Sequence, residues 1–107
     1  MSEGRVQDEV RMVLSGPDIV MFRNNIATAE VRGAWVKFGV GGKGGSDLVG
    51  VVRGRAAFVE VKTPVGRLSA EQKQFAELVR SKGAEFVVLR SADEARAWLA
   101  DMRQRFP

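Results

Sequence analysis

Two short segments rich in valine, residues 47–52 and 56–62, are separated only by the tripeptide RGR at 53–55. Such segments on either side of a glycine-containing turn predict an antiparallel β-hairpin. If the turn centres on the first two residues of the tripeptide, paired residues have numbers that sum to 107, and Asp47 lies opposite Glu60. If it centres on the last two, the sum is 109 and these carboxylates become diagonal neighbours on one face. Either register brings two acidic side chains together.

Charged side chains occupy one face of the second predicted strand. Side chains alternate along a strand, so Glu60 and Lys62 share a face with Phe58, while Val59 and Val61 face the opposite layer. Paired strand residues have Cβ atoms about 4.5–5.5 Å apart, which lets two carboxylates share one divalent cation and removes their repulsion. Lys62 is then placed to hold a water or phosphate oxygen during phosphoryl transfer. The alternative is a solvent-facing hairpin with a cross-strand salt bridge from Lys62 to either carboxylate.

Composition limits the available chemistry. The 107 residues include no cysteine and no histidine, which excludes disulfides, thiol nucleophiles, imidazole bases and the usual nitrogen and sulfur ligands of metals. Lysine and arginine number 17 against 13 aspartate and glutamate, a net charge of +4. This charge favours a polyanion such as nucleic acid, although an ordinary solvated surface explains it equally well. A chain of this length predicts one domain, residues 1–107.

The sequence gives no sign of a membrane protein. No apolar stretch approaches the roughly 18 residues that a membrane-spanning helix needs. The first nine residues carry Glu3, Asp8 and Glu9 instead of the apolar segment of a signal peptide. We therefore expect a soluble protein in the cytoplasm of a bacterium or of a phage-infected host cell, with no membrane partner.

The remaining pattern predicts an α/β fold. Its elements run helix, strand, two hairpin strands, helix, strand, helix, which gives a mixed β-sheet flanked by helices. The elements outside the hairpin are a helix capped by Ser2 and ended by Gly16-Pro17, a strand at 19–22, an irregular or extended segment at 30–38 interrupted by Gly33, a helix capped by Ser69 and closed by Gly83, a strand at 85–90 and a last helix after Ser91.

Two further side chains are candidates for the site. On a helical projection Glu9 borders the buried face of the first helix, where it could reach the carboxylate pair or could pair with a surface cation. Gln72 lies three residues after Ser69, so it could hydrogen-bond a water or phosphate, or simply complete a capping box.

The segment 39–45 contains five glycines and precedes Asp47 directly. It is either a glycine-lined path along which a nucleic-acid backbone approaches Asp47, with Lys43 on a phosphate, or a plain flexible loop. Trp35 could stack on a base or lie in a subunit interface. The candidate nucleic-acid-binding residues are Lys43, Gly44, Ser46, Arg67 and Lys73.

These motifs occur in an order that resembles a known family. The ordered set is GGSD at 44–47, FVEVKTP at 58–64, Leu68-Ser69 followed by Gln72, and Gly83 before an apolar strand. It resembles the virus-type replication-repair nuclease domain, VRR-NUC, within the PD-(D/E)xK superfamily. Ser46 departs from the superfamily pattern, which has proline there; that position shapes a turn and carries no ligand.

The resemblance implies a restriction-endonuclease-like core and hydrolysis of DNA phosphodiesters with Mg²⁺ or Mn²⁺. For modules of this size it also implies a homodimer that cuts branched DNA such as Holliday junctions. Asp47 and Glu60 would be metal ligands, Lys62 would assist the nucleophilic water, and Glu9 and Gln72 would match the carboxylate of the first helix and the glutamine of the following helix. The backbone carbonyl of Val61 would be an additional ligand.

Two hypotheses follow. The first is a metal-dependent, structure-selective DNA endonuclease, with a nuclease acting on linear duplex or single-stranded ends as a variant. The second is a catalytically idle DNA-binding dimer, against which the three retained charges of Asp47, Glu60 and Lys62 argue.

Overall fold

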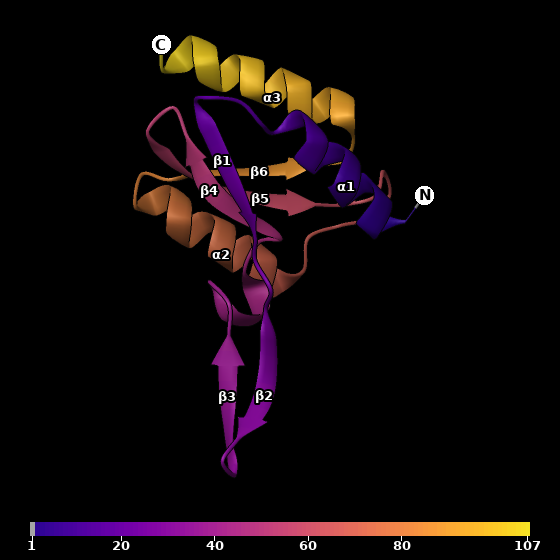
Figure 1. Ribbon diagram of the computed structural model, residues 1–107, viewed down its shortest axis with the longest axis vertical. Coiled ribbons are helices and arrows are strands. Elements are labelled where there is room, and N and C mark those ends of the chain that lie inside the picture. Colours follow the sequence, from indigo (N-terminus) through magenta and orange to yellow (C-terminus); the bar gives the residue numbers. More distant parts are fainter. Residues whose placement is uncertain (1) are drawn as a thin grey trace.

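The computed structural model describes residues 2–107 and contains a four-stranded mixed sheet with helices on both faces (Figure 1). The strand order is β1-β4-β5-β6, in which the first two pairings are antiparallel and the β5–β6 pairing is parallel. These strands are β1 (Ile19–Arg23), β4 (Leu48–Val52), β5 (Arg55–Val61) and β6 (Glu85–Leu89). The predicted α/β fold with a mixed sheet is confirmed.

The helices begin where the predicted caps stand. In α1 (Glu3–Val13) the Ser2 hydroxyl accepts a hydrogen bond from the Arg5 amide at 3.2 Å. In α2 (Ala70–Ser81) Ser69 and Gln72 form both halves of a capping box, in which the amide of each residue donates to the side chain of the other. The last helix, α3 (Ala92–Arg105), is capped by Ser91.

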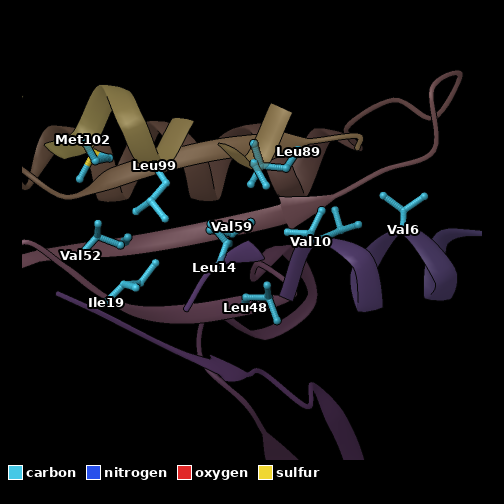
Figure 2. Packing of buried hydrophobic residues seen from close by; sticks show 13 residues of the cluster. Val6, Val10, Leu14, Ile19, Leu48, Val52, Val59, Leu89, Leu99 and Met102 are labelled. Atoms are coloured by element: carbon cyan, nitrogen blue, oxygen red, sulfur yellow. The ribbon is translucent and has the colours of Figure 1, made fainter. Parts of the chain in front are cut away.

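The main core lies between the sheet and the pair α1 and α3. Figure 2 shows its packing, with side chains from both helices meeting those of the strands. The labelled members are Val6, Val10, Leu14, Ile19, Leu48, Val52, Val59, Leu89, Leu99 and Met102. A smaller cluster forms under α2 on the opposite face, from Phe75, Ala76, Val79 and Phe86. The sheet is therefore covered on both faces, but α2 contacts β6 and leaves β1 uncovered.

The register of the central hairpin is the first of the two expected. Leu48 pairs with Val59 and Val52 pairs with Arg55, so paired numbers sum to 107. Arg53 and Gly54 both have positive φ, 52° and 77°, as a tight two-residue hairpin turn requires. This turn fixes which residues face each other at the far end of the hairpin.

Residues 27–38 differ from expectation. Instead of an irregular or extended segment they form a second hairpin, β2 (Ala27–Val31) and β3 (Ala34–Phe38), which projects away from the body of the molecule (Figure 1). Gly33 is its turn and not an interruption, because Arg32 and Gly33 adopt positive φ of 50° and 81°. The predicted element order holds for the main sheet, with this ribbon and a short 3₁₀ turn, η1 (Gly42–Gly44), inserted before β4.

Among residues 2–107, no helix combines the length and the apolar character that crossing a membrane would require.

Candidate active site

Three carboxylates converge at the edge of the sheet where α1 begins, β4 starts and β5 ends. They belong to Glu3, Asp47 and Glu60, and one oxygen of each lies within 4.8 Å of the others. Glu3 is the first residue of α1, Asp47 directly precedes β4, and Glu60 is the penultimate residue of β5. A carboxylate cluster of this kind offers the oxygen ligands that hard divalent cations prefer.

The carboxylates of Asp47 and Glu60 each accept a hydrogen bond from a backbone amide on the opposite side of the hairpin. The Asp47 amide donates to Glu60 Oε1 at 3.2 Å, and the Val61 amide donates to Asp47 Oδ2 at 2.8 Å. The hairpin register places the two residues opposite each other, one step beyond the Leu48–Val59 pair. Neither carboxylate can therefore turn away from the other without losing a hydrogen bond to a backbone amide.

Glu60 is a buried acid in an unfavourable environment for its negative charge. Its exposure is 1%, and burial, reinforced by the charge of Asp47, raises its pKa from 4.5 to about 7. The ammonium of Lys62, with Nζ 3.3 Å from Glu60 Oε2, opposes this rise in pKa. A divalent cation shared by the carboxylates would favour the ionised form far more strongly than one lysine does.

Gln72 is both a helix cap and a site residue. Its side-chain oxygen accepts from the Ser69 amide at 2.9 Å, while Nε2 donates to Glu60 Oε2 at 2.7 Å. The predicted capping box is confirmed, and the amide nitrogen binds Glu60, a partner that the sequence analysis did not name. The capping box fixes the orientation of the side chain, and that orientation presents its donor to Glu60.

Lys62 is held at the end of β5. Its amide donates to the carbonyl of Leu89 at 3.1 Å, which continues the pairing with β6 by one residue. The following loop is tied down because Arg90 Nη1 donates to the carbonyl of Thr63 at 2.7 Å. With 12% of its side chain exposed, Lys62 is shielded from bulk water and directed at the cluster.

The carboxylate that α1 contributes is Glu3, and the expectation for Glu9 is not supported. Glu9 pairs instead with Arg5, at 3.4 Å between Oε1 and Nε, and does not belong to the cluster. The site adjoins the start of α1, so a residue nearly two turns further along lies too far from it. Glu3 is exposed, but it precedes Val10 by seven residues and so lies on the same side of the helix as that buried residue, a signal that the sequence did contain.

The glycine-rich loop is closely packed at one end. A Cβ on Gly44 would overlap the backbone oxygen of Glu71, and one on Gly45 would overlap that of Val40. Gly44 therefore packs against the start of α2 and Gly45 against Val40, so this end of the loop is closely packed, whereas Gly39 and Gly41 are exposed. Ser46 is also fully buried, with its hydroxyl on the carbonyl of Leu48 at 2.9 Å. This burial removes Gly44 and Ser46 from the candidate nucleic-acid surface.

The other candidate contacts with nucleic acid lie on the surface. Lys43, Arg67 and Lys73 are exposed, and Lys43 pairs with Glu71 at 3.3 Å between Nζ and Oε1. Trp35, on the projecting β3, is 73% exposed. Cationic side chains near the start of α2 and an aromatic side chain on the projecting hairpin are thus available to a polyanion.

Comparison with protein families decides the assignment. The chain matches the VRR-NUC domain over residues 8–93 of 107. The chain belongs to the VRR-NUC family. The matched region includes Asp47, Glu60, Lys62 and Gln72, whereas Glu3 precedes it. Searches of curated proteins and of solved structures each found no match.

Membership makes this chain a nuclease domain with DNA as its partner, built on a restriction-endonuclease-like fold. Nucleases of this kind need a divalent metal, and the donor set fits one. It consists of three carboxylates, of which Asp47 and Glu60 are fixed by backbone and side-chain hydrogen bonds. With no thiolate or imidazole in the sequence, the VRR-NUC site has the all-oxygen character that suits Mg²⁺ and Mn²⁺.

Proposed function

We propose that this VRR-NUC domain is a Mg²⁺- or Mn²⁺-dependent DNA endonuclease that acts as a homodimer on branched DNA such as Holliday junctions. The observation that carries the proposal is the carboxylate cluster with the shielded ammonium of Lys62 beside it. Hydrolysis of a phosphodiester needs a water, a way to activate it and positive charge for the phosphorane-like transition state.

Each residue has a distinct task in this proposal. Glu3, Asp47 and Glu60 hold the cation, and the carbonyl of Val61, whose amide already binds Asp47, is an additional ligand. When bound, the cation supplies Lewis-acid charge at the scissile phosphate. Lys62 orients the attacking water and stabilises negative charge on the phosphate oxygens. Gln72 keeps Glu60 in place through the 2.7 Å hydrogen bond.

Exposed cations near the site complete the interface with DNA. Arg67 and Lys73 flank the start of α2, and within residues 2–107 neither has a carboxylate partner within 4.0 Å. Lys43 can exchange its exposed partner Glu71 for a phosphate, because a surface ion pair contributes little stability. We assign these three lysine and arginine side chains to the DNA backbone.

A second copy of the chain would cover an apolar surface that this protomer leaves open. Val20 and Phe22 of β1 and Val51 of β4 are 44%, 63% and 45% exposed, on the part of the α2 side of the sheet that α2 leaves uncovered. Adjacent apolar side chains of this size are typical of an interface. Two protomers would set two sites on opposite strands of a junction, which one small domain could not do.

The experiment is a cleavage assay across a panel of labelled DNA shapes, namely a four-way junction, a flap, linear duplex and single strand, with Mn²⁺. Asp47→Asn is the control, since asparagine retains an oxygen for the Val61 amide but loses the charge. We expect the wild-type protein to cut the junction at paired positions and the variant to be inactive. Equal cutting by both proteins would mean a contaminating nuclease. Cutting restricted to linear ends would contradict the assignment to junctions and favour a nuclease that acts on linear duplex or single-stranded ends.

A further inference from the structure

A cavity lies beside the carboxylate cluster, on the flank that neither Glu60 nor Lys62 lines. Its volume is about 270 Å³. The lining residues are Gln7 of α1, Asp47, and four consecutive residues from the end of β1 into the link to β2, Arg23, Asn24, Asn25 and Ile26. Five of these six side chains are polar or charged, and one is a proposed metal ligand. The cavity is therefore suited to a polar group that is adjacent to the reacting one.

The wall of this cavity is rigidly tied to Asp47. Arg23 pairs with Leu48 in the β1–β4 ladder, and the Asn24 amide extends that ladder by donating to the carbonyl of Asp47 at 2.8 Å. The Asn24 side chain is fully used, with Nδ2 donating to the carbonyls of Val40 at 2.8 Å and Ser46 at 2.9 Å. Asn24 thus acts as a structural clamp that fixes the position of Arg23 relative to the cluster.

The guanidinium of Arg23 has no ionic or hydrogen-bonding partner within residues 2–107. Ile19 and Met21 contact the core under α1, so alternation along β1 directs Arg23 toward the same side, where Gln7 lies. Arg23 is exposed, and within residues 2–107 no carboxylate lies within 4.0 Å of it and its guanidinium makes no hydrogen bond. By contrast, Arg53 and Arg103 both pair with Asp18.

We propose that Arg23, together with Gln7 and Asn25, forms a subsite for a DNA backbone phosphate next to the scissile one. The guanidinium fork matches phosphate geometry with two parallel hydrogen bonds, and the amides of Gln7 and Asn25 supply further donors. This inference rests on the proposed nuclease function and extends it. The subsite would fix the register of the strand, so that one defined phosphodiester faces the carboxylates and Lys62.

The first test compares Arg23→Gln with Arg11→Gln in binding to a labelled junction and a labelled duplex. Both changes remove one charge from an exposed arginine, and Arg11 lines a separate cavity at the other end of α1. We expect Arg23→Gln to weaken binding about tenfold and to reduce the slope of log affinity against log salt by about one, and Arg11→Gln to change neither. Arg23→Lys keeps the positive charge but loses the two parallel hydrogen bonds of the guanidinium. Its affinity for DNA should therefore lie between those of Arg23→Gln and the wild-type protein.

The second test locates the phosphate. Once the cut is mapped, single neutral methylphosphonates replace the phosphates on either side of it. We expect one flanking position at which the wild-type protein loses cutting rate about tenfold and Arg23→Gln loses nothing further. Equal sensitivity of both proteins at every position would overturn the subsite.

The outcomes of these tests separate the two proposals. If the wild-type protein cuts DNA but Arg23→Gln binds DNA as well as Arg11→Gln does, the subsite is refuted. The proposed nuclease function then still stands. A wild-type protein that cuts no DNA refutes the nuclease, and the binding comparison still decides whether Arg23 contacts phosphate. Calorimetric titration with Mn²⁺ should give the same affinity for Arg23→Gln and the wild-type protein, because Arg23 is not a metal ligand.

Discussion

Asp47 and Glu60 face each other across the end of the central hairpin, and the amide of Asp47 donates to the Glu60 carboxylate at 3.2 Å. This contact holds two acidic groups in close proximity although their charges repel, and it leaves Glu60 only 1% exposed. The metal-free protein thus bears a destabilising arrangement at this edge, of the kind that proteins retain at functional sites.

The pKa of Glu60 predicts a pH-dependent stability with an unusual sign. Because the folded-state value of about 7 exceeds the ordinary value of 4.5, the folded state binds more protons than the unfolded state between these pH values. The contribution of Glu60 to the free energy of unfolding should therefore fall as pH rises from 4.5 to 7, by on the order of 3 kcal/mol.

Urea unfolding in the presence of chelator, across that pH range, measures the free energy of unfolding and so tests this prediction. NMR titration of the Glu60 carboxyl measures its pKa. The charge of Asp47 contributes to the raised pKa, so Asp47→Asn should lower the pKa of Glu60 and flatten the pH dependence. A Glu60 pKa that stays near 4.5 in the wild-type protein would contradict the account of its environment.

Adding the metal should reverse this destabilisation. Mn²⁺ at about 100 times its Kd is expected to raise the Tm of a domain of this size by about 10 °C or more. Protons compete with the cation for Glu60, so the rise should be larger at pH 8 than at pH 6. Thermal unfolding of the wild-type protein and Asp47→Asn, each with Mn²⁺ or chelator, checks this. A shift of equal size in the variant would place the ion elsewhere.

Glu3 and Glu9 provide a matched pair on the same helix. Glu3→Gln removes a carboxylate of the cluster and should raise the Mn²⁺ concentration for half-maximal cleavage at least about tenfold. Glu9→Gln removes only an exposed ion pair with Arg5 and should leave that concentration unchanged. If Glu9→Gln has the larger effect, then Glu9 supplies the carboxylate that the structure assigns to Glu3.

The packed glycine loop predicts a stability effect. Gly45→Ala places a methyl group against the backbone oxygen of Val40 and should lower the free energy of unfolding by about 1–3 kcal/mol. Gly4→Ala, in α1 with nothing within 4 Å of the added group, should raise it by about 0.5–1 kcal/mol. Urea unfolding of both variants measures the difference. A Gly45→Ala protein as stable as wild type would show that the loop is not closely packed.

Local chemistry made much of this structure predictable. The turn at 53–55 allowed only two hairpin registers, both of which bring Asp47 and Glu60 together, and the observed one sets them opposite each other. The capping box of Ser69 and Gln72 depends on residues three positions apart. Short-range rules therefore sufficed for the central part of the candidate site.

Features that depend on tertiary contacts were not predictable in the same way. The presence of Glu3 in the cluster in place of Glu9 depends on where α1 meets the sheet, which the helical projection that favoured Glu9 does not contain. The glycine at 44 is explained by the approach of Glu71 in α2, and the glycine at 45 by the approach of Val40 and Ile26, none of which is its neighbour in sequence. The β2–β3 ribbon was missed because Gly33 was interpreted as a break and not as a turn.

The central claim is that Glu3, Asp47 and Glu60 together hold one divalent cation, and calorimetric titration with Mn²⁺ tests it most directly. Wild-type protein should bind one Mn²⁺ per chain and release protons below pH 7, and Asp47→Asn should bind at least about tenfold more weakly. No Mn²⁺ binding by the wild-type protein, or equal affinity in the variant, would contradict the claim.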